Sequence, residues 1–141
     1  MKTTEMTTEH LKTLAEDKNT SLIKLHKTDD QHQLIVENVG YIPEYALKAV
    51  IAKSFSGVYP LDKKGYRTHN LDVLKTKANL SSEFKKEQKN NPRFKANWST
   101  LSSWTTEFRY QTGIEKQTAM RFMNALNNKK GGVYPWIKRY W

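Results

Sequence analysis

Apolar residues recur along this chain at three- and four-residue spacings, which is the period of an amphipathic helix. The strongest helical stretch runs from residue 43 to 55, and a last helix is predicted from about 115 to 128. The apolar positions that share a face are Ala46, Leu47, Val50 and Ile51 in the first stretch, and Ala119, Phe122, Met123 and Leu126 in the second.

Weaker patterns predict further helices between these two. The first 27 residues place four leucines near one helical face, Thr28 is expected to start a helix, and residues 33–39 are apolar enough to be buried. Thr68 or Asn70 is expected to cap a helix that contains Leu71 and Leu74. Residues 85–97 are interpreted as an exposed helix end and a loop broken at Pro92, followed by a helical stretch to residue 108.

No run alternates apolar and polar residues as a half-buried strand would, so the pattern predicts an all-α bundle of four or five helices. The chain of 141 residues suits one domain, 1–141, with residues 134–141 as a short helical segment folded back on it. Its apolar fraction of 37% is modest, but four Trp, seven Tyr and five Phe supply large side chains for a core.

Charge is distributed unevenly along the chain. Residues 1–40 hold seven acids and five lysines, a net of −2, and the remainder holds 19 bases and seven acids, a net of +12. No acid follows Glu115, and this basic, aromatic end is a candidate nucleic-acid or anion site. Its candidate residues are Lys116, Arg121, Lys129, Lys130, Lys138, Arg139 and Trp136. The alternative is a solvated basic face with the aromatic rings buried in the core.

Several kinds of chemistry are excluded or disfavoured. The chain has no cysteine, hence no disulfide, thiolate metal site or thiol nucleophile. No apolar run is long enough for a membrane span, and the first five residues lack the apolar core of a secretory signal, so we expect a cytoplasmic protein without membrane contact. No cofactor motif is present. One helix junction is expected to bring together two histidines and two aspartates, His26, Asp29, Asp30 and His32. This group is better explained as a polar turn than as a metal site.

Three polar features stand out within or beside apolar stretches. Lys48 lies in the most apolar helix, and Glu44 is positioned one turn earlier for a surface ion pair. Arg67 and His69 precede a helix start, where His69 either binds an anion or hydrogen-bonds the loop. Glu107 is placed to pair structurally with Arg109 or with Lys48.

These features, in this order, resemble motifs of the HEPN (higher eukaryotes and prokaryotes nucleotide-binding) superfamily. The matching elements are Glu44-Tyr45-Ala46-Leu47-Lys48-Ala49-Val50-Ile51, Arg67-Thr68-His69-Asn70-Leu71, Arg109-Tyr110 and the amphipathic helix 115–128. The resemblance covers about residues 30–128. It implies an up-and-down four-helix bundle that often forms a homodimer.

Catalytic members of the family are metal-independent endoribonucleases that carry an arginine four to six residues before a histidine near the last helix. That motif is absent here, because His69 is the last histidine of the chain. Members without it serve as binding modules or as accessory subunits, often beside a small nucleotidyltransferase.

Three hypotheses follow. The first is a non-catalytic HEPN-like module that binds nucleic acid, nucleotide or a protein partner, for example as an accessory protein of a defence or toxin–antitoxin system. The second is a divergent endoribonuclease that uses His69 with Arg67 or Arg109. The third is an assembly protein whose aromatic end, residues 134–141, packs on a neighbouring chain.

Overall fold

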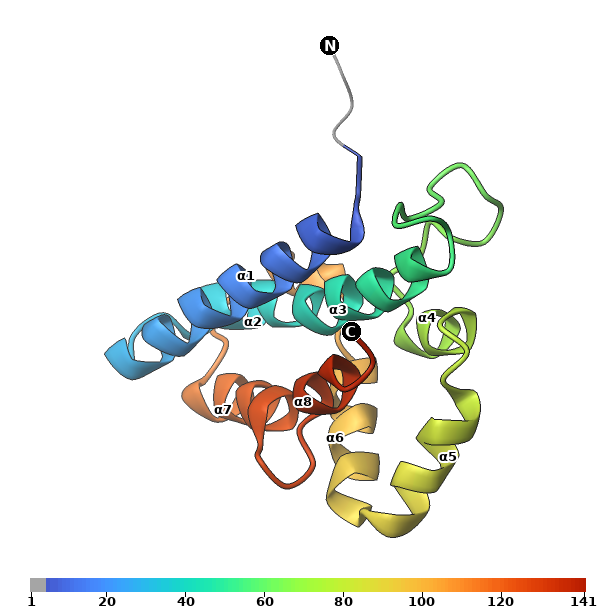
Figure 1. Cartoon of the computed structure of the whole chain (residues 1–141). Helices are drawn as coiled ribbons and strands as arrows, with labels where there is room; N and C mark the ends of the chain where they lie inside the picture. The colour runs from blue at the N-terminus through green and yellow to red at the C-terminus, as the bar shows by residue number, and fades with distance from the viewer. Residues whose placement is uncertain (1–4) are drawn as a thin grey trace.

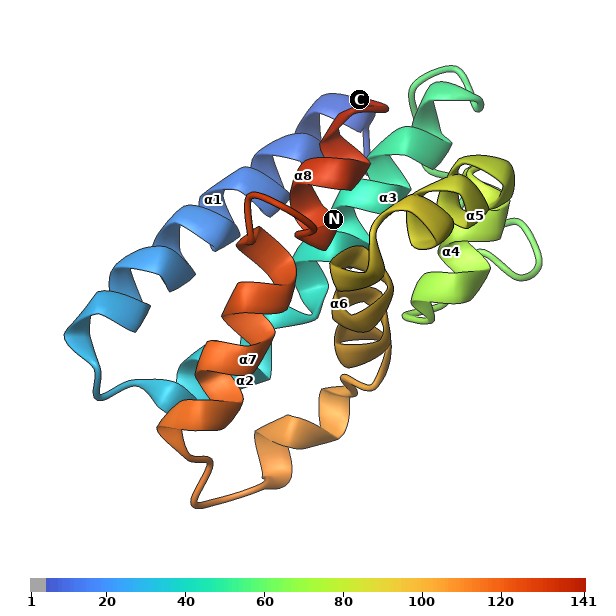
Figure 2. The ribbon, with the colours of Figure 1, turned by 90° about the horizontal axis from the view of Figure 1, so that it is seen from below.

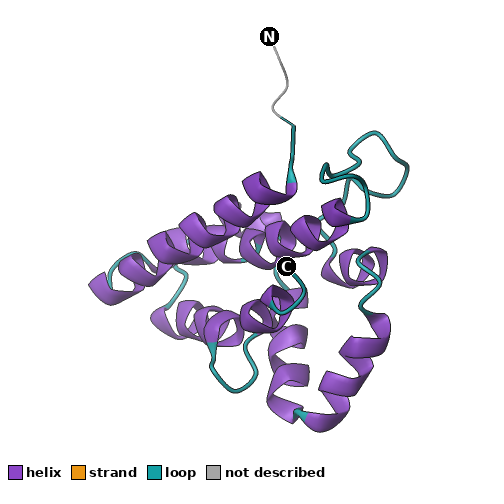
Figure 3. Cartoon of the chain, in the orientation of Figure 1, coloured by secondary structure: helices purple, strands orange, loops and turns teal. Residues whose placement is uncertain are grey.

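The computed structural model describes residues 5–141, and in this part the chain is all-α, with no strand (Figures 1 and 3). The α-helices are α1 Thr8–Thr28, α2 His32–Val39, α3 Tyr41–Lys53, α4 Leu71–Lys77, α5 Ser81–Asn90, α6 Pro92–Ser102, α7 Lys116–Asn127 and α8 Val133–Lys138, and a 3₁₀ helix, η1, spans Thr106–Tyr110. Residues 1–4, which hold most of the segment examined for a secretory signal, lie outside the described residues. None of the helices within 5–141 is long and apolar enough to cross a membrane.

The long helix α1 packs along α3, and α7 packs against both α2 and α6 (Figures 1 and 2). The two strongest sequence predictions are confirmed. Helix α3 buries Ala46, Leu47 and Ile51, and α7 buries Phe122 and Leu126. The short helix α8 folds back on α3 and α7, as the pattern at the C-terminal end predicts.

Thr28 ends α1 instead of starting a helix. Asp29 follows it with φ = 62°, a left-handed conformation that stops the helix and that aspartate tolerates better than most residues. The Thr28 hydroxyl donates to the Leu25 carbonyl at 2.7 Å, as a residue in a last helical turn can. Threonine and aspartate occur near the starts and near the ends of helices. Here the left-handed backbone of Asp29 shows that Thr28 is a helix end.

Helices α2 and α3 are separated only by Gly40, so they form one bent arm through the core. The Trp104 ring lies directly on Gly40, where a Cβ atom would overlap its six-membered ring. The Trp104 indole N–H donates to the Val36 carbonyl at 2.6 Å. The bend therefore has a glycine because the indole of Trp104, from the segment between α6 and η1, occupies that space.

The helix end expected within residues 85–97 is confirmed, because α5 runs to Asn90, but the loop expected at Pro92 is instead a tight helix–helix corner. Only Asn91 separates α5 from α6, and its side chain accepts a hydrogen bond from the Phe94 N–H at 3.3 Å. Pro92 occupies the first position of α6, where its missing N–H costs nothing. The helix expected to continue to residue 108 ends at Ser102, and the chain resumes as η1.

Candidate nucleic-acid interface

The basic C-terminal residues are divided by the fold into paired and unpaired cations. Three of them bind carboxylates of other elements. These pairs are Lys116–Asp29 at 3.0 Å, Lys138–Glu16 at 3.0 Å and Arg139–Glu87 at 3.5 Å. The Lys116 ammonium holds the pKa of Asp29 below its usual value. Arg121, Lys129 and Lys130 are exposed and have no ion pair with the described residues.

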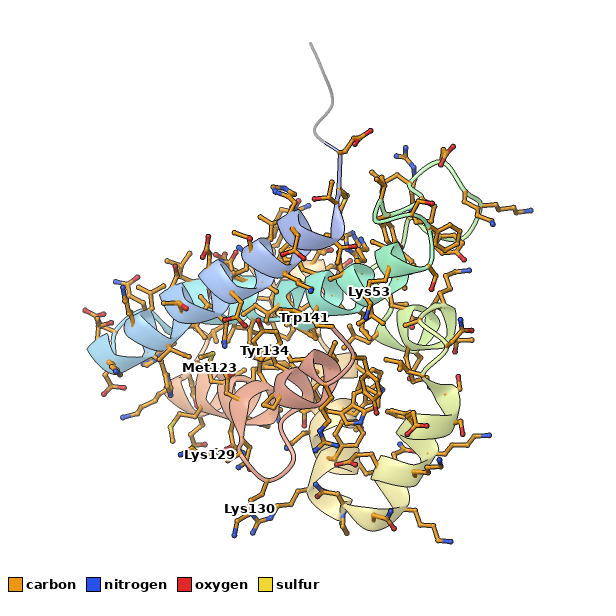
Figure 4. The ribbon with its side chains drawn as sticks, viewed as in Figure 1. Lys53, Met123, Lys129, Lys130, Tyr134 and Trp141 are labelled. Carbon is orange, nitrogen blue, oxygen red and sulfur yellow. The ribbon has the colours of Figure 1, made fainter. Side chains whose placement is uncertain are left out.

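Trp136 is only 2% exposed, at the centre of an aromatic cluster with Phe84, Phe94 and Trp98. Its ring is therefore not accessible for stacking on a base. Tyr134 and Ile137 of the same helix are buried too, and the Tyr134 hydroxyl binds Glu16 of α1 (Figure 4). The apolar face of the C-terminal end is thus already covered within its own chain.

The loop between α7 and α8 lies against the corner between α5 and α6. The Asn91 amide donates to the Lys130 carbonyl at 2.9 Å, and the Asn97 amide donates to the Gly131 carbonyl at 2.9 Å. Space at Gly131 is tight, since an added Cβ atom would lie 3.0 Å from the Arg93 Cβ atom. Two segments more than 30 residues apart are therefore held together by backbone carbonyls of the loop.

This docking gathers exposed cations from both segments into one surface, which we call the basic corner. Lys129 and Lys130 leave the loop at its outer edge (Figure 4). They line a hollow of about 110 Å³ together with Arg139 and one acid, Glu87. The basic corner consists of Arg93, which lies against Gly131, together with Lys129, Lys130 and Arg139.

The sequence places Lys129, Lys130 and Arg139 in the candidate set but misses Arg93. Arg93 lies in the run 85–97, whose many lysines are a visible signal. That run was interpreted as an exposed helix end and a loop broken at Pro92, and only its contact with the α7–α8 loop gives it a shared surface. The fold leaves out Lys116 and Lys138, which serve ion pairs to α1 and the turn after it.

The predicted pair of Glu44 and Lys48 exists, but it is buried rather than at the surface. The two residues are 3% and 6% exposed, and the Lys48 Nζ atom lies 3.0 Å from Glu44 Oε2. His69 Nδ1 lies 2.6 Å from Glu44 Oε1, while most of the imidazole is exposed. Lys48 also lies over the Tyr59 ring, whose burial, with Glu44 nearby, raises the pKa of its hydroxyl.

A buried carboxylate therefore orients an exposed imidazole. The Glu44 carboxylate favours the tautomer with a proton on Nδ1, so Nε2 is left as the acceptor. His69 lines a cavity of about 290 Å³ with Asn70, Asp72, Ser102 and Thr105 among its other residues. Asn70 is the residue that caps α4, as one of the two predicted alternatives states.

Arg67 and Arg109 have other partners. The Arg67 side chain donates to the Leu61 carbonyl at 3.0 Å, which anchors it to its own loop. The Arg109 guanidinium lies 4.9 Å from the centre of the Tyr110 ring. Glu107 is exposed and pairs with neither Arg109 nor Lys48 among the described residues, so the predicted ion pair with Glu107 is wrong.

His26 and His32 lie near the junction between α1 and α2, and both Nδ1 atoms are buried without a hydrogen-bond partner among residues 5–141. Within residues 5–141, no group of three histidine, aspartate or glutamate side chains is arranged to hold a metal ion. Comparisons with protein-family models, with curated proteins and with solved structures found no match to this chain.

Proposed function

We propose that this chain is a non-catalytic helical module that binds the phosphate backbone of nucleic acid through its basic corner. The observation that carries the proposal is the hydrogen-bonded docking of the α7–α8 loop on the α5–α6 corner. It joins two basic segments into one surface whose single acid, Glu87, is paired with Arg139. Three cations of the corner, Arg93, Lys129 and Lys130, have no ion pair with the described residues and are free for phosphates. Binding of phosphate by lysine and arginine is the main source of nucleic-acid affinity.

Contacts to phosphate, not to bases, are expected to dominate this interaction. The large aromatic rings nearest the corner, including Trp136 and Phe94, are buried, so no stacking platform is available there. Phosphate contacts hold a strand in place without reading its sequence. We therefore expect RNA and single-stranded DNA of mixed sequence to bind with similar affinity.

We also propose a family and a cellular role for this chain. The arm α2–α3, together with α1, α6 and α7, corresponds best to the four helices of an up-and-down, HEPN-like bundle, with α4, α5 and α8 as additions. On this assignment the protein is cytoplasmic and forms a homodimer. It then acts as an accessory protein of a defence or toxin–antitoxin system, beside a partner such as a nucleotidyltransferase.

Two variants with the same net charge test the nucleic-acid proposal. Arg93→Gln, Lys129→Gln and Lys130→Gln together lower the net charge from +10 to +7, because three cations are removed. Lys24→Gln, Lys63→Gln and Lys64→Gln do the same at exposed positions outside the corner.

With fluorescently labelled RNA, we expect the corner variant to bind at least about tenfold more weakly and the control variant to stay within about threefold of the parent. Equal losses in both variants would mean that net charge, and not the corner, drives binding.

A divergent endoribonuclease is the second candidate, and the contact between Glu44 and His69 favours it. A carboxylate that holds one imidazole nitrogen and leaves the other free is the arrangement of a general base, here next to a cavity. Incubation of the pure protein with RNA on a gel tests this role. Cleavage that His69→Ala abolishes would support an enzyme, and cleavage that His69→Ala leaves unchanged would exclude that residue.

A further inference from the structure

A second surface, separate from the basic corner, is a groove that runs between α7 and the C-terminal half of α1. The groove has a volume of about 450 Å³. Its floor includes Met123, which lies between the two helices (Figure 4). Ile23 of α1 and Met120 of α7 stand at its edges and are 38% and 45% exposed, although both are large apolar side chains. Methionine adapts its shape readily, which suits a surface that receives another chain.

The charge of this groove has one sign. Lys27 lines it, and Arg121 lines an adjoining hollow that shares Met120 and Asn124 with the groove. Both cations are exposed, and none of the acids in the part of the chain that the structure describes lines either hollow.

The other apolar groove, between α1 and α2, offers a contrast. Its lining includes Leu34, which is 42% exposed, and both Asp17 and Lys18. The charges that line the α1–α2 groove are therefore balanced, whereas the positive charge of the α1–α7 groove favours a negatively charged binding partner.

Polar groups at the groove offer hydrogen bonds as well. Asn19 of α1 and Asn127 of α7 bond reciprocally through their amides, at 3.0 and 2.8 Å, and tie the two helices together. His26 Nδ1 is buried beside the groove without a hydrogen-bond partner among the described residues. A buried polar atom of this kind is costly unless a partner satisfies it.

We propose that the α1–α7 groove receives an amphipathic helix of another protein, with apolar anchors on one face and acidic residues along its edges. Helices that bind in such grooves use apolar side chains spaced three and four residues apart. A second copy of this chain fits less well, because a two-fold contact would bring Lys27 and Arg121 close to their own copies. This surface is separate from the basic corner and does not depend on nucleic-acid binding.

Methyl groups of methionine provide a local readout for this proposal. In protein labelled with ¹³C at the methionine methyls, Met120 and Met123 report on the groove, and Met6 serves as an internal reference. The probe is a synthetic helical peptide of about four turns with leucine anchors and glutamate flanks, and its control carries lysine flanks on the same anchors.

We expect the acidic peptide to shift the Met120 and Met123 methyl resonances, and the basic peptide to leave them unchanged. Met120→Lys should weaken binding at least about tenfold, and Leu34→Lys in the other groove should not. Reversing both charges, Lys27→Glu with Arg121→Glu, should transfer the preference to the basic peptide.

Three results would overturn the proposal. The first is the absence of any shift with the acidic peptide up to about 1 mM, which corresponds to about −4 kcal/mol of binding free energy. The second is an equal response to both peptides, which would assign the groove to apolar contact alone. The third is a Met120 shift that follows protein concentration without peptide, which would assign the groove to a second copy.

Discussion

The buried pair of Glu44 and Lys48 allows a quantitative prediction about stability. Both side chains are almost fully buried, and their charged atoms lie 3.0 Å apart. At an effective dielectric constant of about 20, that separation corresponds to an attraction of about 5 kcal/mol. Glu44→Leu leaves Lys48 buried without a carboxylate, and Lys48→Met leaves Glu44 with only the exposed His69 as a partner, each at a cost of about 3–5 kcal/mol. That loss is comparable to the whole stability of many small domains.

The variants Glu44→Leu and Lys48→Met, alone and together, form a double-mutant cycle. We expect each single variant to lose about 3–5 kcal/mol in free energy of unfolding and the double variant to recover most of that loss, because it removes both charges at once. His69→Ala should cost only about 1 kcal/mol, since the Glu44 carboxylate keeps Lys48 as a partner when the exposed imidazole is removed.

Urea denaturation followed by tryptophan fluorescence measures these differences by linear extrapolation. Single variants that each lose less than about 1 kcal/mol, with losses that add in the double variant, would refute the reasoning. That result would mean that water solvates the pair and that the two charges act independently.

Three further predictions concern packing and pH. Gly40→Ala should destabilise the protein by about 1–3 kcal/mol in thermal melting, because its methyl group overlaps the Trp104 ring. The hydrogen bond from Tyr134, followed by the contacts with Lys138, lowers the pKa of Glu16, so its stabilising effect is present above its usual pKa and is lost as pH falls through the lower folded value. Glu16→Gln should therefore flatten the acid limb of a stability–pH curve. Burial, followed by the hydrogen bond to Glu16, raises the pKa of Tyr134, so absorbance at alkaline pH should show this phenol ionising only as the protein unfolds.

The spacing of apolar residues alone was sufficient to predict the helices whose buried face is continuous. Helix α7 follows its predicted bounds within one residue, because its apolar positions fall every three or four residues between polar ones. The corner at Asn91 was missed because asparagine and proline are typical of both loops and helix starts. Here Asn91 caps the helix that Pro92 begins, and both roles depend on the angle at which α5 meets α6.

The candidate site was predictable only in part, because its parts meet through tertiary contacts. Lys129 and Lys130 were visible as cations after the last acid, but their neighbour Arg93 is 36 positions earlier in the chain than Lys129. A spacing of four residues places Glu44 and Lys48 together without revealing that both are buried. Trp136 was assigned to binding because basic residues surround it in the sequence, but the aromatic cluster that encloses it comes from two other helices, α5 and α6.

The most direct test of the basic corner is the salt dependence of RNA affinity in the parent protein and in the variant Arg93→Gln, Lys129→Gln, Lys130→Gln. For single strands the slope of log affinity against log salt is about −0.7 per phosphate neutralised, so three free cations predict a slope of about −2.1. The variant removes all three, so its slope should be close to zero. Parallel slopes for parent and variant would contradict the assignment of nucleic-acid binding to this corner.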